Sequence, residues 1–309
     1  MLDLLKAENI EYKEIVNDNT ISIEFPCHFN NVYENGLIYI DNIQVDISHL
    51  KNCTVLLPEE FNDLSNKNIN YIITQYPKVA FYILSQNFIQ NNITKGIHQT
   101  AIIGENCSIS QNAYIGPNTI IEDNVKIGEN VLIKGNSYIY SNTIIEENVT
   151  VESNCSIGAT GLFWTWDKTG KMWQLPQLGG VIIKCNSFLG TDITIVRSAY
   201  KFSNTLIGRN CKIAHGSKIG HDCQISDSVH LANNVTLGGS TTIKERCFIG
   251  SAATFRAGIT IEKDNVIGAG ALVTKSFKCE KSLIIGFPAK EKVIEKKLSG
   301  MNDPLHRIK

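Results

Sequence analysis

Two histidines, His215 and His221, stand six residues apart and could serve as acid–base groups. Gly239 follows His221 by 18 residues. If residues at that spacing stack, a general base at His221 lies one strand spacing from the Gly239 backbone N–H, which could hold a developing oxyanion. A lone outward histidine is more often a plain surface residue, but this pairing supplies the minimal apparatus for acyl transfer. We therefore take His221 and Gly239 as catalytic candidates, and His215 as a second, less favoured base.

The elements that would position these residues follow from a six-residue repeat. It runs from Ala101 to Thr160 and from Val181 to Ser276, and only Ala199 to Asn204 interrupts the second block. Each phrase opens with a small or β-branched residue and carries an apolar residue at its third position. Third-position residues of the two blocks include Ile103, Ile109, Ile115, Ile121, Ile127, Ile133, Ile139, Ile145, Val151 and Ile157, then Ile207, Ile213, Ile219, Ile225, Leu231, Leu237, Ile243, Ile249, Phe255, Ile261, Ile267 and Val273.

A period of six matches neither a helix, at about 3.6, nor an exposed strand, at 2. It predicts a stack of short strands with a corner after each, three phrases to a coil. Residues 18 apart then lie about 4.8 Å from each other. The expected fold class is a left-handed parallel β-helix (hexapeptide-repeat solenoid) over residues 98–276. Cysteines that open phrases, such as Cys211 and Cys223, should point inward.

The flanking segments lack the repeat. Residues 1–97 read as a small α/β domain, with strands over Thr20–Phe25, Leu37–Ile43, Thr54–Leu57 and Tyr71–Thr74 and a helix over Pro77–Ile89. Residues 277–309 should form a C-terminal turn at Gly286–Lys290 and a short charged helix over Glu291–Leu298.

An excursion loop, residues 161–180, separates the two blocks and contains all three tryptophans, Trp164, Trp166 and Trp173. Exposed apolar surface of this kind usually docks on something. Two interpretations carry equal weight: the loop contacts substrate, through Trp164 and Trp166, or it packs on a neighbouring subunit. Flat solenoid faces favour a homotrimer with clefts between subunits.

The composition limits the partners. A net charge of −1 argues against nucleic acid or an anionic membrane surface, which require a basic patch. Nine cysteines without a CxxC pair indicate a reducing, cytoplasmic location. We expect no integral membrane segment, because no apolar run reaches about 18 residues. We attribute the many Asn, Ile and Lys residues to codon composition.

Several motifs together resemble the UDP-3-O-acylglucosamine N-acyltransferase family. Trp173–Ile183 resembles that family's tryptophan and "IPQ" segment, Ile193–Arg197 its "TIDRG" segment, and Ile219–Asp222 its "IAHN" histidine. Tyr39-Ile40-Asp41-Asn42 is similar to its "FLSN" base-stacking motif, and Tyr76–Phe81 to a helix start, so the resemblance covers most of the chain.

The resemblance implies a proton-accepting role for His221, an oxyanion role for Gly239, and nucleotide contacts by Tyr39 and Asn42. Arg197 becomes a further substrate-binding candidate. Departures from the family pattern also matter: Ala257-Gly258 replaces the second histidine, Val45 replaces a second base-contacting tyrosine, and the long helix that docks acyl carrier protein is missing. Gly286-Phe287-Pro288-Ala289-Lys290 instead resembles the "GNPAK" ending of coenzyme A-dependent relatives.

We therefore expect an acyl-CoA-dependent N-acyltransferase of a nucleotide-linked amino-deoxysugar, such as dTDP-4-amino-4,6-dideoxyglucose of the anthrose pathway. Coenzyme A would be the acyl donor, held by Arg256, Lys275 and Lys290, with no metal. Either His221 or the departing thiolate would accept the amine proton. The alternative is lipid A synthesis on UDP-3-O-acylglucosamine with acyl carrier protein.

Two remoter alternatives share the solenoid. One is a γ-type carbonic anhydrase with zinc on His215, His221 and His230, but His230 occupies a different position of its phrase, and the first domain is then unexplained. The other is a non-catalytic scaffold, since the repeat itself carries no chemistry.

Overall fold

A computed structural model describes residues 1–88 and 95–293 of the chain. These residues divide into two compact units, with the division after Asn92. The first unit contains helix α1 (Asp3–Ala7), helix α2 (Pro77–Ser85) and the 3₁₀ turn η1 (Gln86–Phe88), with a five-stranded sheet of order β1-β5-β4-β3-β2. Its strands are β1 (Lys13–Ile15), β2 (Phe25–Pro26), β3 (Gly36–Tyr39), β4 (Thr54–Leu57) and β5 (Asn70–Ile73).

The central strands of this sheet are parallel and bury both faces. Leu37, Leu56 and Ile72 pack on Leu84 of α2, and Ile38 and Val55 lie in a second core cluster. Parallel strands covered on both faces read as continuous apolar runs, which is why Thr54–Leu57 was recognisable as a strand.

The sequence prediction for this unit is partly wrong. Only Phe25 of the predicted strand Thr20–Phe25 lies in a strand, because Asp18, Asn35 and Glu24 side chains bind the polar groups of this segment and make it a loop. Leu37–Ile43 is also shortened, since β3 ends at Tyr39.

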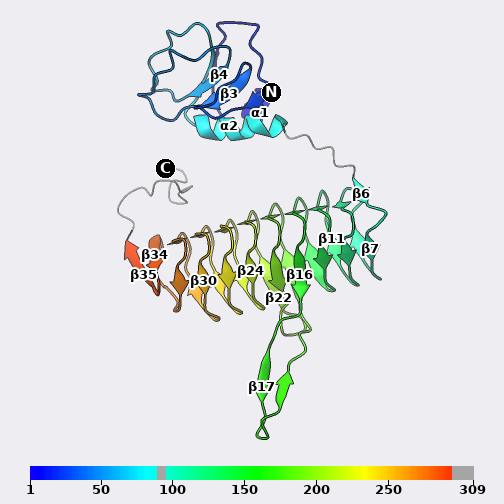
Figure 1. Ribbon diagram of the computed structural model, residues 1–309. Helices are drawn as coiled ribbons and strands as arrows, with labels where there is room; N and C mark the ends of the chain where they lie inside the picture. The colour runs from blue at the N-terminus through cyan, green and yellow to red at the C-terminus, as the bar shows by residue number, and fades with distance from the viewer. Residues whose placement is uncertain (89–94, 294–309) are drawn as a thin grey trace. The chain divides into compact units, whose positions relative to one another are not determined.

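The second unit is the predicted left-handed parallel β-helix, with coils stacked along one axis (Figure 1). Three sheets form its sides in the described residues. A nine-stranded side contains β7 (Ile102–Ile103), β10 (Ile120–Ile121), β13 (Tyr138–Ile139), β16 (Ser156–Ala159), β21 (Thr194–Val196), β24 (Lys218–Ile219), β27 (Thr236–Leu237), β30 (Thr254–Phe255) and β33 (Leu272–Val273).

An eight-stranded side contains β8 (Ser108–Ile109), β11 (Lys126–Ile127), β14 (Thr143–Ile145), β19 (Gly180–Ile183), β22 (Asn204–Ile207), β25 (Gln224–Ile225), β28 (Thr242–Ile243) and β31 (Thr260–Ile261). An eleven-stranded side contains β6 (Gly96–Ile97), β9 (Tyr114–Ile115), β12 (Leu132–Ile133), β15 (Thr150–Val151), β20 (Phe188–Leu189), β23 (Lys212–Ile213), β26 (His230–Leu231), β29 (Phe248–Ile249), β32 (Val266–Ile267), β34 (Ser282–Gly286) and β35 (Ala289–Val293). β6 pairs with β9, so the solenoid already includes Gly96, five residues ahead of Ala101, where the repeat begins in the sequence.

The third-position residues fill the interior. Ile213, Leu231 and Ile249 stack in register on one side and are fully buried. Two pairings skip part of the chain: Thr143 pairs with Val181, past residues 161–180, and Val181 pairs with Thr205, past Ala199–Ser203. Both interruptions therefore loop out of the solenoid while the register on either side is kept.

Many asparagines have a structural role at the corners, so attributing them to codon composition was wrong. The last residue of a phrase adopts the left-handed conformation, as at Asn124 (φ 61°), Asn148 (φ 57°) and Asn210 (φ 55°). Asparagine tolerates this conformation better than other residues that have a side chain.

The inward cysteines are buried thiols. Burial raises the pKa of Cys211 to about 11 and that of Cys223 and Cys247 to about 12, so these groups stay protonated and unreactive. Cys107, near the start of the solenoid, is only partly buried.

The C-terminal part differs from the prediction. Strands β34 and β35 form an antiparallel hairpin around Phe287-Pro288, so Glu291 lies in a strand and not in a helix. Strand pairing along the last coil offers Glu291 hydrogen bonds that an isolated short helix would lack. The rest of the predicted helix, residues 294–298, lies outside the described residues. In the described ranges we find no helix with the length and apolar character to span a bilayer.

The corner geometry makes a stability prediction. Asn210→Val should lower the free energy of unfolding by about 1–2 kcal/mol, because a β-branched residue is disfavoured at φ 55°. Asn210→Gly should be nearly neutral, since glycine accepts positive φ. Thermal or urea denaturation measures both. Equal destabilisation by the two variants would mean that the asparagine side chain, and not the backbone angle, matters.

Candidate active site

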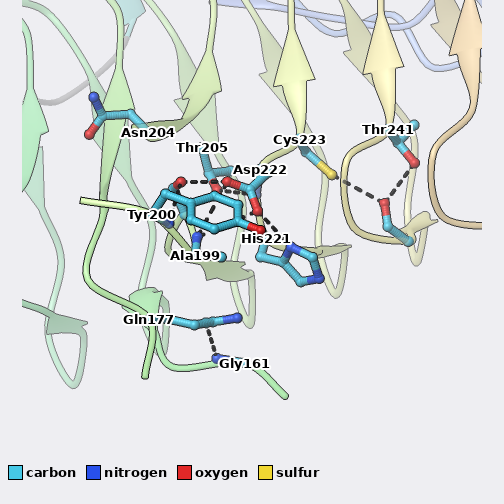
Figure 2. Close-up of polar contacts among 12 residues, drawn as sticks. Gly161, Gln177, Ala199, Tyr200, Asn204, Thr205, His221, Asp222, Cys223 and Thr241 are labelled. Carbon is cyan, nitrogen blue, oxygen red and sulfur yellow. Dashed lines mark hydrogen bonds and ion pairs between the residues drawn. The ribbon is translucent and has the colours of Figure 1, made fainter. Parts of the chain in front are cut away.

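His221 lies at the corner that follows β24 and makes a defined pair with its neighbour. Its Nδ1 lies 2.8 Å from Asp222 Oδ2, and the two side chains are 19% and 22% exposed (Figure 2). A carboxylate only accepts hydrogen bonds, so Nδ1 carries the proton and Nε2 keeps its lone pair in the neutral ring. The pair therefore presents Nε2 as a proton acceptor.

Gly239 occupies the same corner one coil along. β24 pairs with β27 so that Ile219 faces Leu237, and the His221 ring lies against the Gly239 Cα. A Cβ at this position would lie 2.5 Å from His221 Nε2. Within the described coils the Gly239 N–H donates to no protein acceptor. The glycine thus leaves room for the imidazole and leaves one amide free beside it.

The excursion loop is a β-hairpin that projects from the solenoid, with strands β17 (Trp164–Trp166) and β18 (Met172–Gln174) (Figure 1). Its base is fixed by Gln177, whose Oε1 accepts a hydrogen bond of 2.6 Å from the Gly161 N–H. Phe163 at that base packs edge-on against the His221 ring, with 5.2 Å between centroids. The hairpin is therefore attached to the candidate active site.

An apolar groove of about 290 Å³ lies along the hairpin. It is lined by Phe163, Trp164, Thr165, Trp173, Gln174, Leu175 and Pro176. Hydrogen bonds from Thr169 and Trp173 hold the pKa of Asp167 well below its usual range, and Lys171 lies over the Trp173 ring. Of the two predicted tryptophans, Trp164 lines the groove, whereas Trp166 packs edge-on against Trp164 and does not line it.

His215 and Arg197 have other partners. His215 Nδ1 accepts the Thr191 N–H at 2.9 Å, at the corner after β23. Arg197 is 9% exposed and donates to the carbonyl oxygens of Gly158, at 2.7 Å, and Ser141, at 3.3 Å. Two of its nitrogens, Nε and Nη2, thus bind the backbone of earlier coils, which gives Arg197 a structural role, and its contact with substrate stays a prediction.

The predicted coenzyme A residues are exposed. Ala257 and Lys275 continue the corner of His221 and Gly239, since β27, β30 and β33 pair in succession, and Arg256 precedes Ala257. Lys290 lies on the β34–β35 hairpin, opposite Ile285. The structure gives no contact that joins the three basic side chains into one site.

In the first unit, Tyr39 and Asn42 line one pocket of about 580 Å³. The other lining residues are Pro26, Cys27, His28, Phe29, Ile40, Asp41, Val45, Phe81 and Tyr82. Tyr39 packs on Phe81 with 5.0 Å between ring centroids. Asn42 Oδ1 accepts the Gln44 N–H at 3.0 Å, which leaves its Nδ2 donors free for a ligand.

Sequence reasoning missed four residues around His221: Asp222, Ser198, Thr205 and Phe163. The sequence did contain a signal for Asp222, because its carboxylate directly follows the candidate histidine. Ser198 and Thr205 flank the interruption of the repeat, which could have marked them. Nothing in the sequence indicated that Phe163 contacts the imidazole. In the described residues, no group of three or more His, Cys, Asp or Glu side chains is suited to a metal ion.

Comparison with known proteins identifies a family for the solenoid. Residues 100–135, 124–159 and 204–239 match the family described as bacterial transferase hexapeptide (six repeats), and residues 240–275 match the hexapeptide repeat of succinyl-transferase. A UDP-3-O-acylglucosamine N-acyltransferase of Campylobacter lari is 34% identical over 72% of this chain and 73% of its own. The chain belongs to this hexapeptide-repeat acyltransferase family.

Other members of the family match over shorter lengths. A UDP-3-O-acylglucosamine N-acyltransferase of Bordetella avium is 34% identical, but the alignment covers 39% of this chain and 34% of that protein, so the chain spans about a third of its length. The solved UDP-N-acetylglucosamine acyltransferase of Francisella novicida superposes with a TM-score of 0.59, at 28% identity, over 65% of this chain and 71% of its own.

The contact between Gly239 and His221 can be tested directly. Gly239→Ala should displace the His221 ring and break its hydrogen bond to Asp222, because the new methyl would lie 2.5 Å from Nε2. Imidazole ¹⁵N shifts or a crystal structure measures this. Ala257→Gly, one coil along at the same corner, is the matched control and should leave the ring in place. An unmoved ring in Gly239→Ala would refute the close packing.

Proposed function

We propose that this protein is an N-acyltransferase that transfers an acyl group from a thioester donor to the amino group of a nucleotide-linked amino sugar. The observation that carries the proposal is the His221–Asp222 pair beside the free Gly239 amide. A base with an available lone pair next to an unpaired N–H is what aminolysis of a thioester requires.

In this mechanism the neutral amine attacks the thioester carbonyl carbon and a C–N bond forms. The carbonyl oxygen becomes an oxyanion, to which the Gly239 N–H would donate. His221 Nε2 accepts the proton that the amine loses, and Asp222 stabilises the resulting imidazolium. The C–S bond then breaks, and the thiolate is protonated by the imidazolium. If the thiolate instead takes the amine proton itself, His221 only orients the amine.

The pocket of the first unit suits a nucleotide base. Tyr39 and Phe81 provide aromatic faces for stacking, and the free Nδ2 donors of Asn42 suit a carbonyl oxygen on the base edge. The names of the matching relatives favour UDP-3-O-acylglucosamine as the acceptor. Val45 lines the same pocket at the position where the resemblance implies a second base-contacting tyrosine, and this departure is the argument for the second candidate, an amino-deoxysugar on a different nucleotide such as dTDP.

The acyl donor has two candidates, coenzyme A and acyl carrier protein. Lys275 lies at the same corner as His221 three coils along, about 14 Å away at one strand spacing per coil. A cation at that position supports coenzyme A, whose phosphates would lie far from the thioester. In the same proposal, Arg256 and Lys290 are further candidates for contacts with the phosphates of coenzyme A. The acyl carrier protein is the alternative donor.

The hairpin groove would hold the apolar part of the acyl group. Phe163 contacts the His221 ring and also lines the groove, so an acyl chain that starts at the reacting carbonyl could continue along Trp164 and Trp173. We also propose a homotrimer, because the exposed hairpin tryptophans and the flat solenoid sides suit contacts between subunits.

Substitution of His221 tests the reaction. Turnover should be measured with UDP-3-O-acylglucosamine and with dTDP-4-amino-4,6-dideoxyglucose, each with acyl-CoA and with acyl carrier protein as donor. His221→Ala should lower kcat by about 10²–10⁴-fold on the accepted pair, because general-base catalysis contributes that much. His215→Ala, at another corner, is the matched control and should retain most activity.

Three results would contradict parts of this proposal. No turnover with any pair would refute N-acyl transfer to these sugars, and turnover with the carrier protein alone would exclude coenzyme A as donor. If His221→Ala keeps more than about a third of kcat with an unchanged pH profile, the thiolate takes the proton and not His221.

Substitution of Tyr39 tests the nucleotide pocket. Tyr39→Ala should weaken nucleotide-sugar binding by about 1–3 kcal/mol, since one stacked base is lost. Calorimetric titration with UDP- and dTDP-sugars measures the change and shows which base is preferred. Tyr33→Ala, an exposed tyrosine outside the pocket lining, is the control. Unchanged affinity in Tyr39→Ala would place the nucleotide elsewhere.

A further inference from the structure

The Asp222 carboxylate is held by more than the histidine. Its Oδ2 accepts from His221 Nδ1, and its Oδ1 accepts the hydroxyl of Ser198 (Figure 2 shows the Asp222 end of this network). The Ala199 N–H also points at Oδ1, at 3.3 Å. Ser198 is fully buried, whereas Asp222 is partly exposed. The same N–H lies 3.4 Å from Oδ2, so it is shared between the two oxygens, whereas the Ser198 hydroxyl contacts Oδ1 alone and the imidazole contacts Oδ2 alone.

The solenoid register brings Ser198 to this position. β21 pairs with β24 so that Thr194 faces Lys218, and Ser198 and Asp222 close equivalent phrases in adjacent coils. The six residues Ala199–Asn204 that interrupt the repeat begin at this corner. Their first N–H, that of Ala199, points at Asp222, and Thr205 directly after them accepts the Asp222 N–H at 2.9 Å. The two ends of the interruption thus both hydrogen-bond to Asp222, Ala199 to its carboxylate and Thr205 to its backbone N–H.

Ser198 and Asp222 both lie in segments that resemble family motifs. Where the family patterns read "TIDRG" and "IAHN", this chain has Ser198 in place of the glycine and Asp222 in place of the asparagine. A hydroxyl donor and the carboxylate that accepts it therefore occur together. Without the Ser198 hydroxyl, the long contacts of the Ala199 N–H, at 3.3 and 3.4 Å, would be left to oppose rotation of the Asp222 carboxylate about its χ2 torsion and away from the imidazole.

We propose that Ser198 is a positioning residue for the base: its hydroxyl fixes the Asp222 carboxylate so that Oδ2 holds the Nδ1–H of His221 and Nε2 stays free to accept a proton. The catalytic consequence rests on the proposed function. The geometric consequence, a single tautomer of His221 with its proton on Nδ1, does not depend on any substrate.

The test reads the Nδ1 and Nε2 ¹⁵N shifts of the neutral His221 imidazole in the full chain, with His221→Gln to assign those signals among the seven histidines. Asp222 is the carboxylate that hydrogen-bonds to the imidazole in the described residues, and Phe163, the aromatic side chain packed on the ring, is uncharged. Asp222→Asn should populate both tautomers, because an amide can donate or accept, whereas the carboxylate only accepts and so fixes the proton on Nδ1.

Ser198→Ala should also mix the two tautomers, to a smaller extent than Asp222→Asn, because the carboxylate is then less firmly held. Ser198→Thr, which keeps the hydroxyl, should restore the wild-type tautomer. Ser187→Ala removes a buried hydroxyl that donates to the Gly208 carbonyl and should change stability without changing this signal.

A single preserved tautomer of His221 in Ser198→Ala would overturn the proposal. If Ser198→Ala does not fold, Ser198→Gly, which adds no atoms, gives the same comparison. Absence of acyl transfer would refute the proposed function and leave these ¹⁵N shifts readable, so the two failures are distinguishable. If both hold, Ser198→Ala should lower kcat with little change in KM, and Ser198→Thr should restore it.

Discussion

The fixed register between stacked coils is the constraint on which the rest of this structure depends. Each aliphatic third-position residue packs on its equivalents above and below, and backbone hydrogen bonds join the same coils, as between Ile213 and Leu231. A slip by one residue would turn the aliphatic row to the solvent, so the register is strongly specified. The positions of the corner residues are therefore also well defined, because each corner lies a few bonds from a paired strand.

The active-site geometry uses that precision. His221 and Gly239 meet because β24 and β27 are paired, and Ser198 meets Asp222 because β21 and β24 are paired. None of these four residues needs a loop of its own to reach its partner. Short corners on a rigid stack lose little entropy when they hold a base and an amide at contact distance.

The two interruptions of the repeat are where the solenoid departs from structural regularity. Residues 161–180 form the hairpin that brings Phe163 to the imidazole, and Ala199–Asn204 begin beside the carboxylate of Asp222. Both begin after strands of the side that carries His221. The regular repeat specifies only how the coils stack. Side chains that contact the catalytic candidates therefore come from the two insertions, which explains why residues of both lie around His221 and Asp222.

The sequence by itself determined the solenoid, its register and the pairing of His221 with Gly239, because a strict period of six has one regular solution and equivalent positions must then stack. It also indicated Tyr39 and Asn42 as candidate nucleotide contacts, through resemblance to a family motif and not through the geometry of the repeat. Tertiary structure alone decided the partners of side chains that the period does not place. Arg197, expected to contact substrate, is buried against backbone carbonyls of earlier coils. Ser198 meets Asp222 because β21 and β24 pair across the interruption, and Thr205 of β22 meets it at the other end of that interruption, which the repeat marks but whose path it does not give. Phe163 belongs to the flank of the hairpin, whose path depends on packing against the finished stack, so no local pattern could place it beside His221.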